Sequence, residues 1–175
     1  MKCVIFLDFD GVMDTESYDS YLVNNNMPNV DEYGPVFDPE CVNTLKTIHN
    51  AIGAQIVVSS TWKEFMTLEE IREMWKKRNL PGYILDVTPN VNPHFRGDEI
   101  NAWLESQEEE YLYAIIDDLD ASQFTEEQLA FFVQTNPWCG IDEETRQRVL
   151  YLMRREITTV LKETCNKQEN TKYTR

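Results

Sequence analysis

Two aspartates near the start of the chain have the type and spacing for cation chemistry. Asp8 and Asp10 directly follow the apolar run 2–7, and Gly11 comes next. Carboxylates two residues apart, where a strand turns into a loop, can converge on one cation, and glycine permits an abrupt turn there. Taken alone, such a pair is more often a solvated loop. The acid, glycine and glutamate offsets of a calcium-binding EF-hand loop are missing.

Three other polar groups raise the significance of this pair. Ser59 and Ser60 follow a second apolar run, and their hydroxyls can hydrogen-bond phosphoryl oxygens. Arg96 precedes a predicted helix and offers a fixed cationic fork. Asp117 and Asp118 end a later apolar run and supply further carboxylates for an ion. The combination indicates a site for a divalent cation and a phosphate.

Short apolar runs alternating with helical patterns determine where these groups must lie. Five runs are predicted strands: 2–7, 56–58, 83–87, 111–116 and 131–134. Helices are predicted after the capping residues Asp38, Thr67 and Asp142, and from about Gly97. This alternation predicts an α/β fold with a mainly parallel sheet flanked by helices. In such sheets ligands bind beyond the carboxyl ends of the strands, where the polar groups stand.

The length of 175 residues predicts a single catalytic domain over 1–165 followed by a polar, frayed tail over 166–175. Residues 13–37 are polar, have no clear period and are predicted to form a long loop or flap. This flap is the only room for a cap over the site. Neither His49 nor His94 can be assigned a catalytic role, and the four cysteines lack the close spacing of a zinc site.

The charge is strongly acidic and unevenly distributed. Sixteen basic residues against 31 acidic ones give a net charge of −15, which disfavours non-specific nucleic-acid binding. From Arg146 to Arg175, however, eight basic and three acidic residues give +5. This basic helix is either the solvated face of a terminal helix, which is the commoner case, or a nucleic-acid contact. The apolar runs are too short to cross a membrane, and no signal-peptide pattern opens the chain, so we expect a cytoplasmic protein.

Taken in order, the motifs resemble those of the haloacid dehalogenase (HAD) superfamily. LDFDGV matches the first motif, IVVSSTW the second, Arg96 the third and AIIDDLD the fourth. The segments SSTWK, RGDEINAWL and CGIDEE are similar to the HAD domains related to Swiss army knife RNA-repair proteins, with Lys63 in place of an arginine. The resemblance extends from Cys3 to about Leu152 and implies a Rossmann-like HAD fold with a minimal cap.

The resemblance also implies roles for individual residues. Asp8 would attack phosphorus and form an aspartyl-phosphate, and Asp10 would act as general acid and then general base. Mg²⁺ would be held by Asp8, the backbone carbonyl of Asp10 and Asp118. Ser59 and Arg96 would bind the transferring oxygens. An aspartate at position 10 favours phosphatase over dehalogenase chemistry.

Several assignments stay open at the level of sequence. Ser60 competes with Ser59, which we prefer, because strand ends are uncertain by a residue or two. Lys63 competes with Arg96 as the phosphate-binding cation, the alternative being a surface residue that opens a helix. Asp117 is either a metal ligand itself or a residue that holds the metal ligands in place without contacting the metal. Three tryptophans are predicted to lie in the core rather than to stack on bases: Trp62, Trp75 and Trp103.

The sequence thus predicts an Mg²⁺-dependent phosphomonoester hydrolase. Its expected partner is a phosphorylated substrate, which is a nucleic-acid end, a nucleotide or a small metabolite. The alternative from a different class is a non-catalytic module that binds Mg²⁺ or phosphate.

Overall fold

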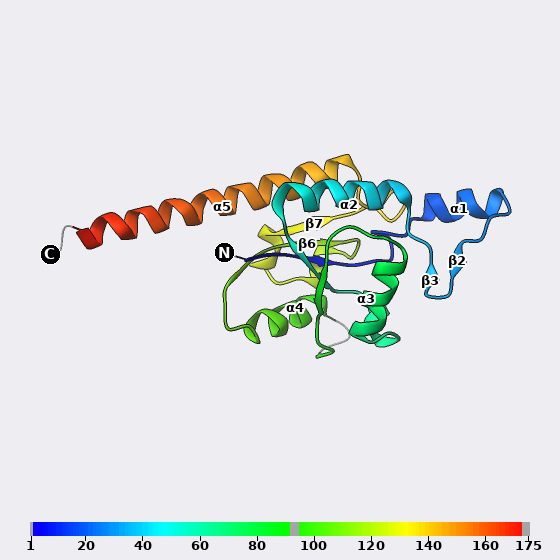
Figure 1. The fold of residues 1–175 in the computed structure, drawn as a ribbon, viewed down its shortest axis with the longest axis horizontal. Helices are drawn as coiled ribbons and strands as arrows, with labels where there is room; N and C mark the ends of the chain where they lie inside the picture. The colour runs from blue at the N-terminus through cyan, green and yellow to red at the C-terminus, as the bar shows by residue number, and fades with distance from the viewer. Residues whose placement is uncertain (1, 92–94, 173–175) are drawn as a thin grey trace.

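The computed structural model describes residues 2–91 and 95–172. Its centre is a parallel sheet in the order β5-β4-β1-β6-β7 (Figure 1), in which all four neighbouring pairs are parallel. The five strands are β1 (Lys2–Leu7), β4 (Gln55–Val58), β5 (Ile84–Val87), β6 (Tyr111–Asp117) and β7 (Phe132–Gln134). The predicted α/β fold with a parallel sheet is confirmed.

Helices cover both faces of this sheet, as Figure 1 shows. They are α2 (Pro39–Ile52), α3 (Leu68–Lys77), α4 (Arg96–Glu105) and α5 (Glu143–Lys172). One buried cluster joins α2, α3 and α5 to one face, and a second cluster joins α4 to the other. Because side chains alternate along a strand, odd-numbered residues of β1 enter the first cluster and even-numbered residues enter the second.

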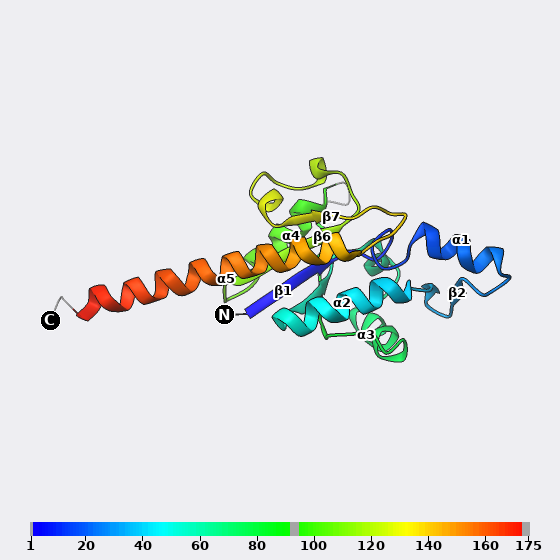
Figure 2. The same ribbon diagram turned by 90° about the horizontal axis from the view of Figure 1, so that it is seen from above.

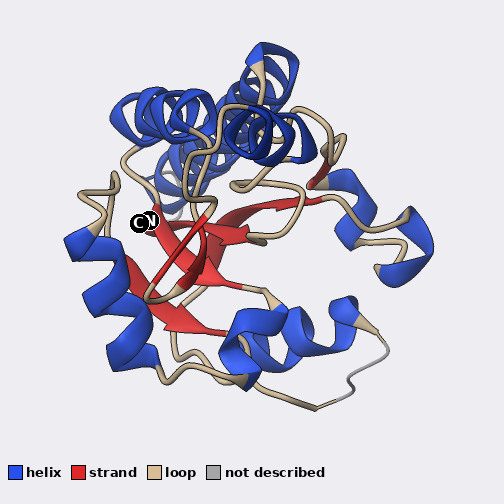
Figure 3. Cartoon of the chain, turned by 90° about the vertical axis from the view of Figure 1, so that its right-hand side faces the viewer, coloured by secondary structure: helices blue, strands red, loops and turns tan. Residues whose placement is uncertain are grey.

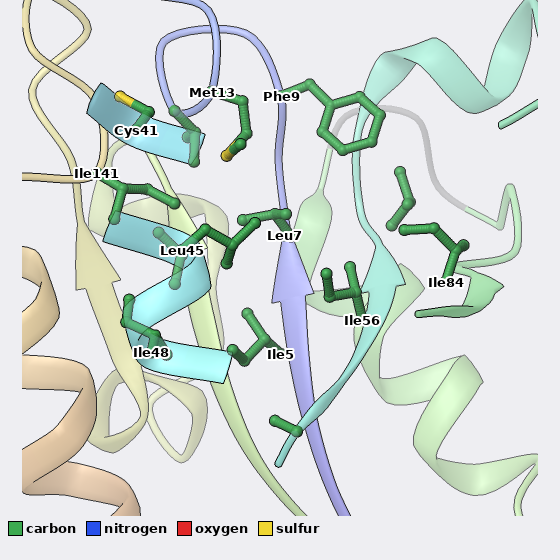
Figure 4. Close-up of a cluster of buried hydrophobic side chains, with 14 of the residues drawn as sticks. Ile5, Leu7, Phe9, Met13, Cys41, Leu45, Ile48, Ile56, Ile84 and Ile141 are labelled. Carbon is green, nitrogen blue, oxygen red and sulfur yellow. The ribbon is translucent and has the colours of Figure 1, made fainter. Parts of the chain in front are cut away.

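The first cluster is the larger of the two and contains the predicted tryptophans Trp62 and Trp75. Ile5 and Leu7 of β1 contribute to it, together with Leu45 and other side chains of α2 (Figure 4). Trp103 lies in the second cluster. The prediction that these three indoles are core residues is confirmed, since none is more than 8% exposed.

The helix boundaries follow the capping chemistry of the sequence. The Asp38 carboxylate accepts from the Glu40 amide at 2.8 Å in front of α2, and Gly53 ends that helix with φ +63°. Thr67 and Glu70 form the reciprocal capping box that opens α3. Before α3, a short 3₁₀ helix, η1 (Thr61–Glu64), follows β4 directly.

Residues 13–37 are more ordered than the predicted long loop. They contain α1 (Glu16–Asn24) and a hairpin of β2 (Val30–Asp31) and β3 (Gly34–Pro35). Of α1 only Leu22 is buried, so the helix lacks the apolar stripe by which a sequence pattern reveals a helix. Figure 2 shows α1 and the hairpin beyond the carboxyl ends of the strands.

Helix α5 continues beyond the predicted start of a frayed tail at residue 166, and reaches Lys172. Its first half packs against α2 and β6, while its second half projects away from the rest of the molecule (Figures 1 and 2). Among residues 2–91 and 95–172, no helix combines the length and apolar character needed to cross a bilayer.

Candidate active site

The strand registers place three of the predicted residues at one level. The last residue of β1 pairs with Val58 of β4 and with Ile116 of β6, so Asp8, Ser59 and Asp117 follow side by side. By the alternation of side chains, all three lie on the face that α4 covers. They stand at the carboxyl ends of the strands, the end of the molecule that faces the viewer in Figure 3.

Arg96, the first residue of α4, lies among these three side chains. Its Nη2 is 3.8 Å from Asp8 Oδ2, its Nε is 3.6 Å from Asp117 Oδ2, and its Nη1 donates to Ser59 Oγ at 3.5 Å. Charge-assisted hydrogen bonds close at about 2.7–2.9 Å, so none of these contacts is tight. The guanidinium is 92% buried yet retains donor capacity towards a bound anion.

Lys63 is bound differently. Its Nζ lies 2.5 Å from Glu99 Oε2 and donates to Thr88 Oγ1 at 2.7 Å, and both charged side chains are more than 90% buried. Burial lowers the pKa of Lys63, with Glu99 acting in the opposite direction. The Lys63 amine is therefore already paired with a protein carboxylate. This geometry favours Arg96 over Lys63 as the cation available to a bound anion. The sequence had offered both.

Both serines of the second motif touch this site. Ser59 contacts Arg96, as described above, whereas the Ser60 side chain hydrogen-bonds Asp8 and partly offsets the rise in the pKa of Asp8 that burial causes. Ser60 Oγ also accepts from the Trp62 amide at 3.5 Å at the start of η1. Both hydroxyl groups are almost fully buried.

Three carboxylates converge beside Arg96. Oxygens of Asp8, Asp117 and Asp118 all lie within 4.8 Å of one another. Burial is the main cause that raises the pKa of Asp8 to about 6 and that of Asp117 to about 8. Asp117 Oδ2 is buried without a hydrogen-bond partner. Three carboxylates share one guanidinium, so the cluster has the excess of acid that a cation site needs.

The donor set fits Mg²⁺, because hard carboxylate oxygens are the ligands this ion prefers and no soft ligand belongs to the cluster. Gly11 contributes space: a Cβ at this position, where φ is +67°, would lie 2.5 Å from Asp118 Oδ2. The Asp10 carboxylate is not part of the cluster. It accepts from Trp62 Nε1 at 2.9 Å and from Thr61 Oγ1 at 3.3 Å.

Sequence reasoning missed several residues of this site. Asp14 Oδ1 accepts from the Gly11 amide at 3.0 Å, and burial followed by the Asp10 charge raises the pKa of Asp14 to about 7. Its position in the same loop, six residues after Asp8, was the available signal. Glu99 lies three residues after Arg96 on α4, where helical spacing places both towards the sheet.

Of the histidines, His49 hydrogen-bonds the Ala54 carbonyl, and His94 lies outside the described residues.

A cleft of about 620 Å³ adjoins Asp10, Gly11 and Asp118. Further acids from the α1 region, including Asp14 and Glu16, line it, as does Trp138, which is 55% exposed. Among its described lining residues no side chain is basic. A ligand that enters from this side therefore meets negative charge.

A parallel α/β sheet with an aspartate pair, serines, a buried arginine and an acid pair at successive strand ends defines a HAD-superfamily domain. The model of the HAD domain in Swiss Army Knife RNA repair proteins matches residues 4–145, and the chain belongs to this family. Neither the comparison with curated proteins nor that with solved structures found a match. The membership supports a phosphatase-type hydrolase at a coarse level.

Proposed function

We propose that this chain is an Mg²⁺-dependent phosphomonoester hydrolase that works through an aspartyl-phosphate. The observation that carries the proposal is the place of Arg96. A buried guanidinium lies 3.5–3.8 Å from the nucleophile candidate Asp8, from Asp117 and from Ser59, without a tight bond to any of them. Such an arginine can bind the oxygens of a phosphoryl group as negative charge builds on them.

The chain's own residues then have separate tasks. An Asp8 oxygen forms a bond to phosphorus while the bond from phosphorus to the leaving oxygen breaks, and Asp10 gives that oxygen a proton. In the second half, water attacks the phosphorus of the aspartyl-phosphate, Asp10 takes a proton from it, and Asp8 is released. Ser59, Ser60 and Arg96 hold the phosphoryl oxygens through both halves.

Asp8, Asp118 and the Asp10 carbonyl would hold Mg²⁺, with Asp117 as a further ligand or as an anchor behind them. The ion would supply positive charge that offsets the repulsion between an anionic nucleophile and an anionic phosphate. Asp117 Oδ2, which is buried and accepts no hydrogen bond although Arg96 Nε lies 3.6 Å away, supports such a cation at this place.

Two surfaces bear on the substrate. The family's occurrence in RNA-repair proteins supports a phosphorylated nucleic-acid end, and a groove on α5 lined by Arg146, Arg154, Arg155 and Tyr151 offers basic and aromatic side chains. However, Arg146 is paired with Glu143, and the cleft beside Asp10 is acidic. The acidic cleft favours a compact monophosphate, such as a mononucleotide or small metabolite, over a long strand.

The experiment is phosphate release by wild type and by Asp8→Asn, each with Mg²⁺ and with EDTA. The substrates are a mononucleotide, an end-phosphorylated oligonucleotide and p-nitrophenyl phosphate. We expect wild type to depend on Mg²⁺, and Asp8→Asn to stay folded but lose turnover by several orders of magnitude, because the nucleophile is gone.

The matched control is Asp120→Asn, the same chemical change at an exposed loop residue whose carboxylate caps a turn through the Ser122 amide. It should retain wild-type turnover. Wild-type turnover in Asp8→Asn, or full activity in EDTA, would contradict the proposal. Binding of phosphate compounds without any cleavage would favour the non-catalytic module.

A further inference from the structure

The short helix η1 does more than connect β4 to α3, because two of its side chains reach Asp10. The Trp62 indole Nε1 donates to Asp10 Oδ1 at 2.9 Å, and Thr61 Oγ1 donates to Asp10 Oδ2 at 3.3 Å. Asp10 is an exposed side chain, in contrast to Asp8, which is 4% exposed. Packing alone therefore does not fix its carboxyl group; these two hydrogen bonds do, together with a side-chain hydrogen bond between Asp10 and Asp14.

The indole also distinguishes the two oxygens of this carboxyl group. An indole N–H can only donate a hydrogen bond, whereas a hydroxyl can donate or accept. The unprotonated oxygen of a carboxyl group accepts a hydrogen bond better than the protonated one, so the contact with Trp62 favours Oδ1 as the unprotonated oxygen. A proton on Asp10 is then favoured on Oδ2, whose contact with Thr61 is longer and allows the hydroxyl either to donate or to accept.

Trp62 is itself held from several sides. Its ring meets Phe9 edge-on at 5.3 Å and Phe37 at 5.7 Å, and the Arg78 guanidinium lies 5.7 Å from its centroid. The hairpin rests on the same ring, since a Cβ on Gly34 would be 3.4 Å from it.

The β2–β3 hairpin is held in place by hydrogen bonds from Arg78. Its Nε and Nη2 donate to the two oxygens of Asp31 in β2 at 2.9 and 2.7 Å. The same guanidinium stacks on Phe37 at 4.7 Å. A chain of contacts therefore runs from the hairpin through Arg78 and Trp62 to Asp10.

We propose that Trp62 is a positioning residue for Asp10, with the β2–β3 hairpin and Arg78 as its support. The inference rests on the proposed hydrolase function and adds a residue to it. In the first half-reaction the Asp8 oxygen bonds to phosphorus, the leaving oxygen departs with its electron pair, and Asp10 Oδ2 gives it a proton. Trp62 acts through Asp10 and does not touch the reacting atoms.

The test is Trp62→Phe, which keeps an aromatic ring but removes the N–H. Its kcat/KM, which reports only the steps through formation of the aspartyl-phosphate, is measured with p-nitrophenyl phosphate and with a simple alkyl phosphate. The nitrophenol leaves without a proton, but the alkoxide needs one from Asp10. General acids contribute about 10²–10⁴-fold, so we expect a loss of at least ~10-fold with the alkyl phosphate and less than ~3-fold with p-nitrophenyl phosphate.

Trp75→Phe is the matched control, because it removes an indole N–H of the same cluster that donates to the Pro81 carbonyl at 3.0 Å and not to Asp10. It should affect both substrates by the same factor. Thr61→Val, at an exposed position that does not threaten folding, should repeat the leaving-group signature of Trp62→Phe at smaller size.

The outcomes are distinguishable. If Trp62→Phe lowers kcat/KM for both substrates equally, the indole is a packing residue and the inference is overturned, while the hydrolase function stands. If wild type cleaves neither substrate, the proposed function fails and the inference fails with it. A loss confined to the alkyl phosphate supports both.

Discussion

Two buried cations flank the candidate site, and they are bound in opposite ways. Lys63 has one acidic partner, Glu99, at 2.5 Å. Arg96 lies between two acids, Asp8 and Asp117, at 3.8 and 3.6 Å. Both cations stand on or beside motifs that a sequence search would assign to phosphate binding. The two cations differ in how tightly they are paired and not in charge or burial, and on the proposed function this difference leaves Arg96 to bind the ligand.

The chemistry of the two groups explains the difference. An ammonium is a compact point charge that closes on one carboxylate, whereas a guanidinium spreads five N–H donors over a plane. Lys63 therefore links η1 to α4 through its ion pair with Glu99. The Arg96 guanidinium instead makes longer contacts with several acceptors. The region of Lys63 is balanced in charge, while the region of Arg96 has an excess of acid.

The largest effect we expect comes from breaking the balanced pair. Lys63→Met leaves Glu99 buried without its partner, which costs about 3–5 kcal/mol in the free energy of unfolding. Urea unfolding measures this loss. The double variant Lys63→Met/Glu99→Met removes both charges and should recover most of the stability.

This double variant also controls for function. After correction for folded fraction, its kcat/KM should stay within a few-fold of wild type if Lys63 only holds η1 against α4. A loss as large as that of an Arg96 variant would mean that Lys63 binds substrate, and the comparison between the two cations would be wrong.

The second effect is on the Arg96 side and appears in activity. Arg96→Gln keeps hydrogen-bonding capacity but removes the charge that faces the phosphoryl oxygens. Loss of one such preorganised donor costs about 10²–10³-fold in rate. Steady-state kinetics at saturating Mg²⁺ measures it. An Arg96→Gln enzyme with wild-type kcat/KM would show that the loosely bound guanidinium is structural.

The smallest effect, per pH unit, comes from the acid excess around Arg96. Folding raises the pKa of Asp117 from 3.8 to about 8 and that of Asp8 to about 6. A carboxyl group with a raised pKa keeps its proton in the folded state where the unfolded chain has lost it. In the metal-free protein the stability that these two groups contribute is therefore fully present below about pH 4 and is lost as the pH rises to about 8. Each group contributes at most about 1.4 kcal/mol per pH unit.

Unfolding in EDTA between pH 6 and 8 measures this slope. Asp117→Asn should flatten it, and Mg²⁺ should restore stability most strongly at the upper end of the range. The exposed Asp120→Asn should leave the slope unchanged. An equally steep slope in Asp117→Asn would show that the acid excess does not lie at this residue.

Much of the site was predictable because it depends on strand ends. Asp8, Ser59 and Asp117 each follow an apolar run, and parallel strands bring their carboxyl ends to one edge. The choice between Arg96 and Lys63 was not predictable in this way. It depends on Glu99, whose burial against η1 arises only when α4 packs on the sheet.

Helix α1 and the role of Trp62 escaped prediction for related reasons. The local cap at Thr15, which accepts from the Tyr18 amide at 3.1 Å, opens α1 without an apolar stripe to reveal it. Trp62 was correctly predicted to be buried, but a hydrophobic pattern says nothing about where its N–H points. Tertiary contacts supply this information.

The central place of β1 has a consequence for biosynthesis. This strand is synthesised before both of its neighbours, since β4 and β6 begin at Gln55 and Tyr111. Pairings so distant in sequence make folding slow and leave an unpaired apolar strand exposed during translation. Asp8 can meet Asp117 only after the whole segment between them, including β4, has been made. A nascent chain that stalls before β6 contains Asp8 without Asp117, and the edge of β1 that β6 would cover stays unpaired and open to chaperones.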